Sequence, residues 1–404
     1  MSVSPDRFAA LWRSLLPIGR NGDGGYVRYS WSEAELACRE WFVEEALDRD
    51  LDVEIDGNGN LWAWWGSPDE SSDSAILTGS HLDSVPHGGA YDGPLGVVSA
   101  LLAVDVLRER GVRPARPLAV VVFTEEEGAR FGVPCLGSRL LTGAVAPDRA
   151  RDLRDRDGKT LADAMAQAGL DPDRLGPDPA RLARVGAFVE LHIEQGRALD
   201  DLGRPVGVAS AIWPHGRYRL DFTGQGNHAG TTRMTDRHDP MLTLAYTVLA
   251  ANKEARLQGA HATVGKVDVE PNATNAIPAR AIAWLDARAA DEATLDGLVE
   301  AIRKRAEDRA GRDGTAFTLK AESTTTEVSF DNPVSRLAAR ELDAPILPTG
   351  AGHDAGVLAG HVDTAMLFVR NPTGISHAPQ EHASDVDCAA GVDGLADVLA
   401  RLCR

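Results

Sequence analysis

The sequence predicts an α/β protein in which a parallel or mixed sheet, covered on both faces, is interrupted by an inserted α+β domain. One observation is that continuous apolar strand patterns such as RPLAVVVFTEEEG alternate with helical patterns such as DGPLGVVSALLAVDVLRERG. The other is a β-α-β-β-α-β order of patterns from 209 to 325, after which patterns of the first kind resume. We therefore expect residues 1–208 and 326–404 to form one domain, into which residues 209–325 are inserted.

Local patterns place the elements of the first domain. After a helical N-terminal region, LDVEIDGNGNLWAWWG alternates and turns at Asn58-Gly59, which predicts a hairpin. SAILTGSHLDSV is a short apolar strand, and the helical pattern that follows it ends at Gly111. Residues 148–185 are rich in Asp, Arg, Pro and Gly, so we expect a solvated surface excursion with one helix around KTLADAMAQAG. AFVELHIEQG then restores the buried strand pattern.

The inserted domain begins with the strand pattern GRYRLDFTG and the helical pattern DPMLTLAYTVLAANKEA. Two strand patterns, ATVGKVDVE and ARAIAWLDARA, come next. The helical pattern EATLDGLVEAIRKRAEDRAG and the strand pattern AFTLKAEST complete it. This order is typical of a compact domain with one layer of strands and one of helices.

Composition and charge exclude some classes of function. A chain of 404 residues that is 43% hydrophobic fits two domains of ordinary size. Its 42 Lys plus Arg against 60 Asp plus Glu give a net charge of -18, which repels nucleic acid and anionic membranes. We therefore expect neither as a partner.

The sequence predicts a soluble protein that stays in the cytoplasm. No apolar run approaches the length of a membrane span, and the first residues lack the pattern of a secretory signal. The four cysteines show no CxxC spacing, which indicates neither a disulfide framework nor a thiolate zinc site.

Potential metal ligands lie near the ends of the buried strands of the first domain. They are His81 and Asp83, the glutamates of TEEEG, His192 and His377, with one more carboxylate, Asp92, in GGAYDGPLG. Imidazole nitrogen and carboxylate oxygen together suit Zn²⁺, Mn²⁺ or Co²⁺. A single histidine near a strand end is more often a packed residue, so the indication comes from the set.

Three consecutive glutamates, Glu125, Glu126 and Glu127, follow the strand VVVFT. Adjacent carboxylates in a buried site repel one another unless cations are present, and two divalent ions would supply those cations. One glutamate could then bind metal while its neighbour handles a proton. The alternative is a solvated acidic turn.

Eight segments together resemble one known family, the M20-type dinuclear metallohydrolases. Within it the chain is similar to the amidase/hydantoinase/carbamoylase group, which includes N-carbamoyl-L-amino-acid hydrolases, β-ureidopropionases and allantoate amidohydrolases. The segments run in family order from residue 79 to 379 and are GSHLDSVPHGGAYDGPLGV, TEEEGARFG, LGSR, ELHIEQG, NHAGTT, PNATNAIP, GAGHDA and GISHAP. The resemblance implies a metallopeptidase-like catalytic domain and an inserted ferredoxin-like domain that serves as lid and dimerisation domain.

The resemblance also implies roles for single residues. One of two divalent ions, Zn²⁺ or Mn²⁺, would be bound by His81, Asp92 and His192, and the other by the bridging Asp92 with Glu127 and His377. Glu126 would be the general base and acid, Asp83 would orient the His81 imidazole, and Glu125 would be structural or support the ligands. His228 would stabilise the oxyanion, and the residues that would contact the substrate are Gln195, Asn275 and Arg288. In the family, residues of the inserted domain often reach the site from the partner subunit of a homodimer.

The substrate that the resemblance implies is a small anion with a ureido group. LFVRNPTGISHAP and Arg217 in PHGRYRL are more similar to allantoate amidohydrolases than to carbamoylases, and His215 would face the same ligand. We therefore expect an allantoate amidohydrolase, with N-carbamoyl-L-amino-acid hydrolase or β-ureidopropionase as the alternative. A dinuclear aminopeptidase or dipeptidase would share the metal ligands, and a non-catalytic metal-binding protein would be expected to lack some of them.

Overall fold

The computed structural model describes residues 2–69, 71 and 73–404, and the chain divides into two units. One unit is Met1–Ala211 with Ser329–Arg404, and the other, the inserted unit, is Ile212–Val328. Among the described residues, no helix combines the length and the apolar character needed to span a membrane.

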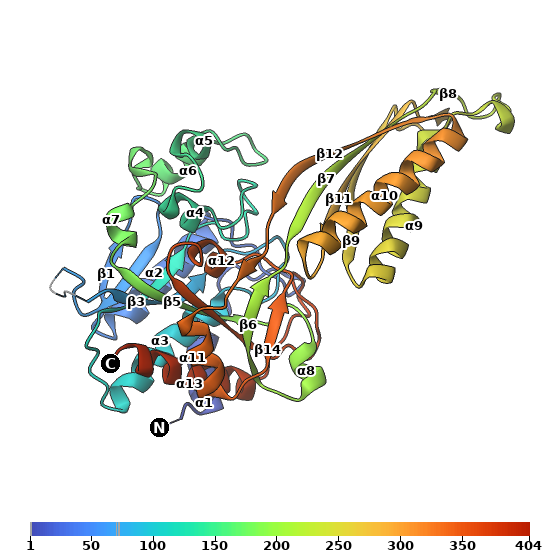
Figure 1. The fold of residues 1–404 in the computed structure, drawn as a ribbon. Helices are drawn as coiled ribbons and strands as arrows, with labels where there is room; N and C mark the ends of the chain where they lie inside the picture. The colour runs from blue at the N-terminus through green and yellow to red at the C-terminus, as the bar shows by residue number, and fades with distance from the viewer. Residues whose placement is uncertain (1, 70, 72) are drawn as a thin grey trace. The chain divides into compact units, whose positions relative to one another are not determined.

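The first unit is built on a nine-stranded mixed sheet with the order β1-β2-β4-β3-β5-β15-β6-β13, in which β14 also pairs with β6 (Figure 1). The central strands β4, β3, β5 and β15 are parallel, whereas β1, β2 and β6 pair antiparallel. This sheet confirms the predicted α/β class. The strands are β1 (Asp52–Ile55), β2 (Leu61–Trp65), β3 (Ala75–His81), β4 (Leu118–Phe123), β5 (Val185–Ile193), β6 (Val206–Ile212), β13 (Val328–Ser329), β14 (Ile346–Thr349) and β15 (Asp363–Val369).

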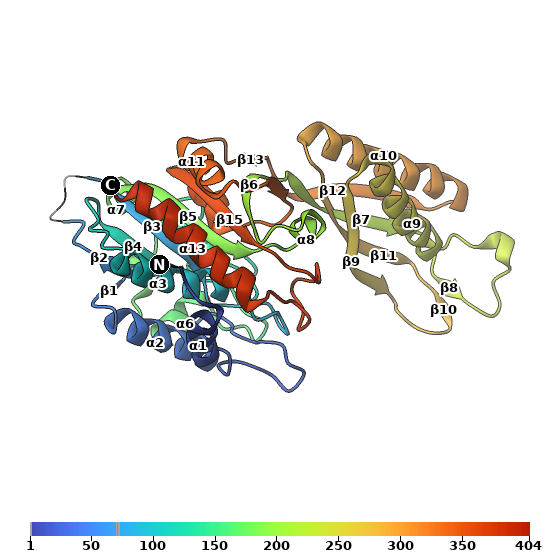
Figure 2. The same ribbon diagram turned by 90° about the horizontal axis from the view of Figure 1, so that it is seen from below.

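Both faces of the central strands are buried, because successive side chains point to opposite faces and helices cover each of them. In β4, Leu118, Val120 and Val122 pack into the core formed with α1 (Pro5–Leu15), α2 (Glu33–Leu47), α3 (Pro94–Glu109) and α13 (Asp385–Leu402). On the other face the ring of Phe123 meets that of Phe188 edge to face. Figure 2 shows α13 running along the sheet. Further helices of this unit are α4 (Leu136–Thr142), α8 (Ala198–Leu202), α11 (Pro333–Leu342) and α12 (Asp354–Leu358).

Residues 148–185 are mostly exposed or half-buried, as predicted, and the predicted helix is α6 (Leu161–Gln167), but the segment holds further short elements. These are α5 (Pro147–Arg151), a 3-10 turn (Pro172–Arg174) and α7 (Pro179–Leu182). Their few apolar side chains are buried together with Trp31, Phe131 and Leu136 in a small separate core. The composition predicted the solvent-facing character of this segment but not the small core by which it packs against the rest of the unit.

The inserted unit has one antiparallel sheet, of order β12-β7-β11-β9, against which α9 and α10 pack. Alternate residues of β7, Tyr218, Leu220 and Phe222, point into the core between sheet and helices. The main elements follow the predicted order and are β7 (His215–Thr223), α9 (Pro240–Gln258), β9 (His261–Glu270), β11 (Arg280–Arg288), α10 (Glu292–Asp313) and β12 (Ala316–Thr325). A short pair, β8 (Asn227–His228) with β10 (Ala276–Ile277), lies at one end of the unit (Figure 1). The role of the inserted unit as a lid or dimerisation domain stays a prediction.

Candidate metal centre and active site

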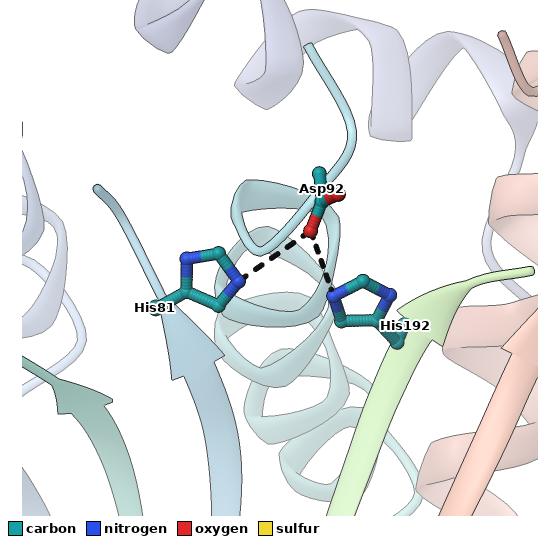
Figure 3. A group of neighbouring side chains, drawn as sticks. All are labelled: His81, Asp92 and His192. Carbon is teal, nitrogen blue, oxygen red and sulfur yellow. Dashed lines mark ion pairs between the residues drawn. The ribbon is translucent and has the colours of Figure 1, made fainter. Parts of the chain in front are cut away.

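The parallel strands β4, β3 and β5 end at one edge of the sheet, where open α/β sheets place their sites. His81 is the last residue of β3, and His192 is next to last in β5. Asp92 comes from the loop before α3, and its carboxylate lies between the two imidazole rings (Figure 3). Its Oδ1 is 3.6 Å from His81 Nε2 and 3.2 Å from His192 Nε2.

The hydrogen bonds of the two histidines leave their Nε2 atoms available to a metal. His81 Nδ1 is 3.1 Å from the carbonyl oxygen of Asp83, and His192 Nδ1 is 2.9 Å from that of Ile193. A carbonyl only accepts, so in the neutral form of each ring, which is the form that binds metal, Nδ1 carries the proton and Nε2 keeps its lone pair. Both Nε2 atoms are buried without a hydrogen-bond partner among the described residues. Such buried, unsatisfied nitrogens facing a shared carboxylate fit a divalent cation.

A second group of potential ligands shares Asp92. Asp92 Oδ2 is 3.3 Å from Nε2 of His377, and that nitrogen is 3.5 Å from Glu127 Oε2. Within each of the two groups, ligand atoms lie within 4.8 Å of one another. Burial and the charge of Asp92 raise the pKa of Glu127 to about 7, as expected where carboxylates crowd together. The donor set therefore suits two ions, for both of which Asp92 would be a ligand.

Glu126 lies beside the first group and belongs to neither. Its Oε2 is 3.5 Å from His81 Nε2, and its Oε1 accepts a hydrogen bond from the Cys135 thiol at 3.5 Å. Burial raises the pKa of Glu126 well above its usual range, and neighbouring carboxylates add to the rise, although His81 opposes it. A carboxyl group with a raised pKa in this position suits proton transfer.

Asp83 and Glu125 hold this part of the site in place. The two oxygens of Asp83 accept hydrogen bonds from the backbone amides of Glu126 (3.2 Å) and Glu127 (3.1 Å). Glu125 has a left-handed backbone, with φ of 54°, and its Oε1 accepts the amides of Arg130 and Phe131 at 2.9 and 2.7 Å. Glu125 therefore closes the loop, while its two neighbours face the candidate metal ligands.

Gln195 lies beside the second group of ligands. Its Nε2 donates to Asp92 Oδ2 at 2.8 Å and to Ser376 Oγ at 3.2 Å. The same nitrogen is 3.4 Å from His377 Nε2. In this structure Gln195 thus contacts candidate metal ligands, and its predicted contact with substrate stays a prediction.

The sequence-based reasoning missed two buried residues of the site, His353 and Asp354. The His353 ring lies 4.5 Å from that of His192, and its Nε2 has no hydrogen-bond partner in the described part of the chain. Asp354 hydrogen-bonds to the Ser138 hydroxyl. The segment GAGHDA, which helped to carry the family resemblance, was the available signal. Glu190 could complete a third ligand group with His192 and His353, but its oxygens already accept hydrogen bonds from Ser80 and Ala355.

His228 and Asn275 lie close together in the inserted unit. His228 pairs with Ala276 in the short β8–β10 ribbon, and the Asn275 carbonyl accepts the amide of Ala229 at 2.9 Å. The Gly230 amide donates to His228 Nδ1 at 3.1 Å. Neutral His228 must therefore carry its proton on Nε2, from which the exposed ring can donate a hydrogen bond.

Arg288, His215 and Arg217 gather at the other end of the inserted sheet. Arg288 is the last residue of β11 and pairs with His215 of β7. Its guanidinium donates to both oxygens of Asp286, at 2.7 and 3.1 Å, and Arg217 lies 3.8 Å from the same carboxylate. His228 lies beyond the opposite end of the nine-residue β11, so about 25 Å or more separates it from Arg288. Within one inserted unit, the structure therefore does not bring His228 and Asn275 together with Arg288, His215 and Arg217.

Comparisons with known proteins place the chain among similar sequences and structures. The model of peptidase family M20/M25/M40 matches residues 77–401. The chain is 38% identical over 396 residues to an N-carbamoyl-L-amino acid amidohydrolase from Geobacillus stearothermophilus, covering 95% of this chain and 96% of the relative. It is 33% identical over 396 residues to an allantoate amidohydrolase from Escherichia coli (strain K12), covering 96% and 95%.

A solved structure is also similar over its full length. The crystal structure of a hydantoinase/carbamoylase family amidase from Burkholderia multivorans superimposes with a TM-score of 0.87. The sequence identity is 31%, and the match covers 100% of this chain and 99% of the other.

Proposed function

The chain belongs to peptidase family M20/M25/M40, and from this premise we propose that it is a dinuclear metal-dependent amidohydrolase that cleaves a ureido C–N bond of a small carboxylate. One observation carries the proposal. Asp92 belongs to two groups of potential metal ligands, and the buried Glu126 lies 3.5 Å from His81 of the first group. In this proposal His81, Asp92 and His192 hold one ion, and Asp92, Glu127 and His377 hold the other. Zn²⁺ and Mn²⁺ both suit these ligands.

Each residue of the proposed site has a separate role in the reaction. When bound, the two ions would lower the pKa of a water and polarise the substrate carbonyl. Glu126 takes the proton of the attacking water and later delivers it to the departing nitrogen. His228 donates its Nε2–H to the oxyanion, and Arg288 binds the substrate carboxylate with its planar guanidinium. Asn275, Gln195, His215 and Arg217 complete the substrate contacts.

Two substrates are to be distinguished. The segment LFVRNPTGISHAP and Arg217 favour allantoate, whereas the 38% identity to the Geobacillus protein favours an N-carbamoyl-L-amino acid. We propose allantoate as the substrate and the carbamoyl amino acids as the second candidate. All of these are small anionic ureides, as the role of Arg288 requires.

The experiment is ammonia release by the Mn²⁺- or Zn²⁺-loaded protein with allantoate, N-carbamoyl-L-amino acids and N-carbamoyl-β-alanine, measured side by side. Faster turnover of allantoate supports the proposal and contact roles for Arg217 and His215. Preference for a carbamoyl compound keeps the metal chemistry and rejects allantoate. Turnover of dipeptides without turnover of any ureide would reject the ureido C–N bond as the target.

Replacing Arg288 with Ala is expected to raise KM for the anionic substrate about 10–100-fold with a smaller change in kcat. The reason is the loss of the charged, hydrogen-bonded pair between the guanidinium of Arg288 and the substrate carboxylate. The measurement is steady-state kinetics with the preferred ureide. Arg219→Ala is the matched control, since Arg219 lies on the same sheet and forms the same forked pair with Asp221. An unchanged KM in Arg288→Ala would remove Arg288 from the binding site.

We also propose a homodimer that forms through the inserted unit, in which the partner's His228 and Asn275 complete each site. The distance between His228 and Arg288 supports this, since one small substrate cannot contact both from the same unit. Exposed apolar residues of α9, Leu242, Leu249 and Leu257, and the edge strand β9 offer a surface for a second copy. Light scattering should give twice the chain mass of 43.0 kDa. A monomer with full activity would contradict the proposal.

A cytoplasmic location is part of the proposal. All four cysteines are buried and none is paired within the described chain, as is usual in a reducing compartment.

A further inference from the structure

Glu381 connects the loop of His377 to the loop of Asp92. It follows His377 by four residues, and its side chain is only 4% exposed. Its Oε1 accepts two successive backbone amides, those of Tyr91 at 2.9 Å and Asp92 at 3.0 Å. The amide of Asp92 itself is therefore held by a carboxylate that lies 289 residues further along the chain.

The two loops are also closely packed around this contact. A methyl group at Gly89 would come within 2.3 Å of Glu381 Oε1, so no larger residue fits there without displacing the carboxylate. The Tyr91 ring stacks on Trp12 at 4.8 Å and meets the ring of His382 edge to face at 5.9 Å. The loop of Asp92 is thus seated between α1 and the segment that carries His377.

We propose that Glu381 is a positioning residue that sets the separation between Asp92 and His377, and thereby the affinity of the second metal subsite. His81 and His192 belong to strands, which hold them independently of Glu381. His377 belongs to a loop and has a left-handed backbone, with φ of 57°, so its position relative to Asp92 depends on contacts between loops. The first subsite should therefore tolerate the loss of Glu381 much better than the second. This inference rests on the proposed dinuclear centre.

The test is calorimetric titration of the metal-free protein with Zn²⁺, comparing wild type with Glu381→Ala and Glu381→Gln. In Glu381→Ala the second equivalent should bind about 10–100-fold more weakly, and the first should bind with nearly unchanged affinity. In Glu381→Gln the amide oxygen still accepts both backbone amides, so the second affinity should return to within about threefold of wild type. Two unchanged affinities in Glu381→Ala, or equal losses in the Ala and Gln variants, would overturn the proposal.

Two further variants guard against an effect of misfolding. Glu194→Ala is the matched control, because Glu194 is also buried and also accepts two successive amides, those of Ala198 and Leu199, which carry no candidate ligand. It should keep both affinities. Gly89→Ala disturbs the same contact from the other loop and should weaken the second equivalent even if Glu381→Ala does not fold. Unchanged binding in Gly89→Ala would speak against the proposal.

A spectroscopic readout separates this inference from the proposed function. Mn²⁺ bound as a close pair gives an exchange-coupled signal in electron paramagnetic resonance, and Glu381→Ala at equal Mn²⁺ should lose it while Glu381→Gln keeps it. If wild type itself binds a single ion, the dinuclear proposal fails. If wild type and Glu381→Ala both show the coupled pair, only the role of Glu381 fails.

Discussion

Replacing Glu126 with Gln is expected to lower kcat about 10²–10⁴-fold while the protein still binds two metal ions. Glutamine occupies the same volume as glutamate but cannot take a proton from water or return it to the departing nitrogen. Glu126 lies outside both groups of candidate ligands, so its replacement should leave them in place. The measurement combines steady-state kinetics with the metal content of the purified variant.

Glu125→Gln is the control for this experiment. Glu125 is the neighbouring buried carboxyl group, and its Oε1 accepts the amides of Arg130 and Phe131, which a glutamine oxygen can also accept. This variant should keep most of the wild-type kcat. Undiminished activity in Glu126→Gln would remove the proton-transfer role from Glu126.

Replacing Asp92 with Ala is expected to reduce activity below detection and to prevent the binding of both ions. Asp92 is the member common to the two ligand groups, and each group keeps only two other side chains without it. His377→Ala removes a ligand from one group only, so this variant should retain one ion. Metal analysis after dialysis against trace Zn²⁺ should therefore give two, one and no equivalents for wild type, His377→Ala and Asp92→Ala.

The result would contradict the shared-ligand arrangement if Asp92→Ala still bound two ions. Equal losses of bound metal in His377→Ala and Asp92→Ala would contradict this arrangement as well, because the two subsites could then not be filled separately. Thermal unfolding of the metal-free proteins gives the necessary control for folding, since neither replacement removes a large apolar side chain.

The sequence predicted those features of the molecule that are determined by residues close together in the sequence. Buried strands with polar ends placed His81, Glu126 and His192 at one edge of a sheet, and the structure shows these residues there. The α/β class and the mixed sheet are confirmed for the same reason, since strand and helix patterns are local. The assigned roles of the site residues remain predictions until the variants are measured.

Contacts between distant segments were beyond prediction. Nothing near Glu381 indicates that it would accept the amide of Asp92, and the segment GAGHDA marks His353 as a site residue without indicating that its ring would meet that of His192. The small core beneath residues 148–185 was missed because its apolar residues are scattered among charged ones. Each of these features depends on how chain segments fold back on one another, which periodicity does not reveal.

The length of β11 has a genetic consequence. Under the proposed dimer, the nine residues from Arg280 to Arg288 keep His228 and Arg288 in different active sites. A chain defective in Glu126 and a chain defective in His228 would then each supply what the other lacks at one of the two sites of a mixed dimer. Two alleles that each encode an inactive enzyme would restore activity when expressed together, which is complementation within a single gene.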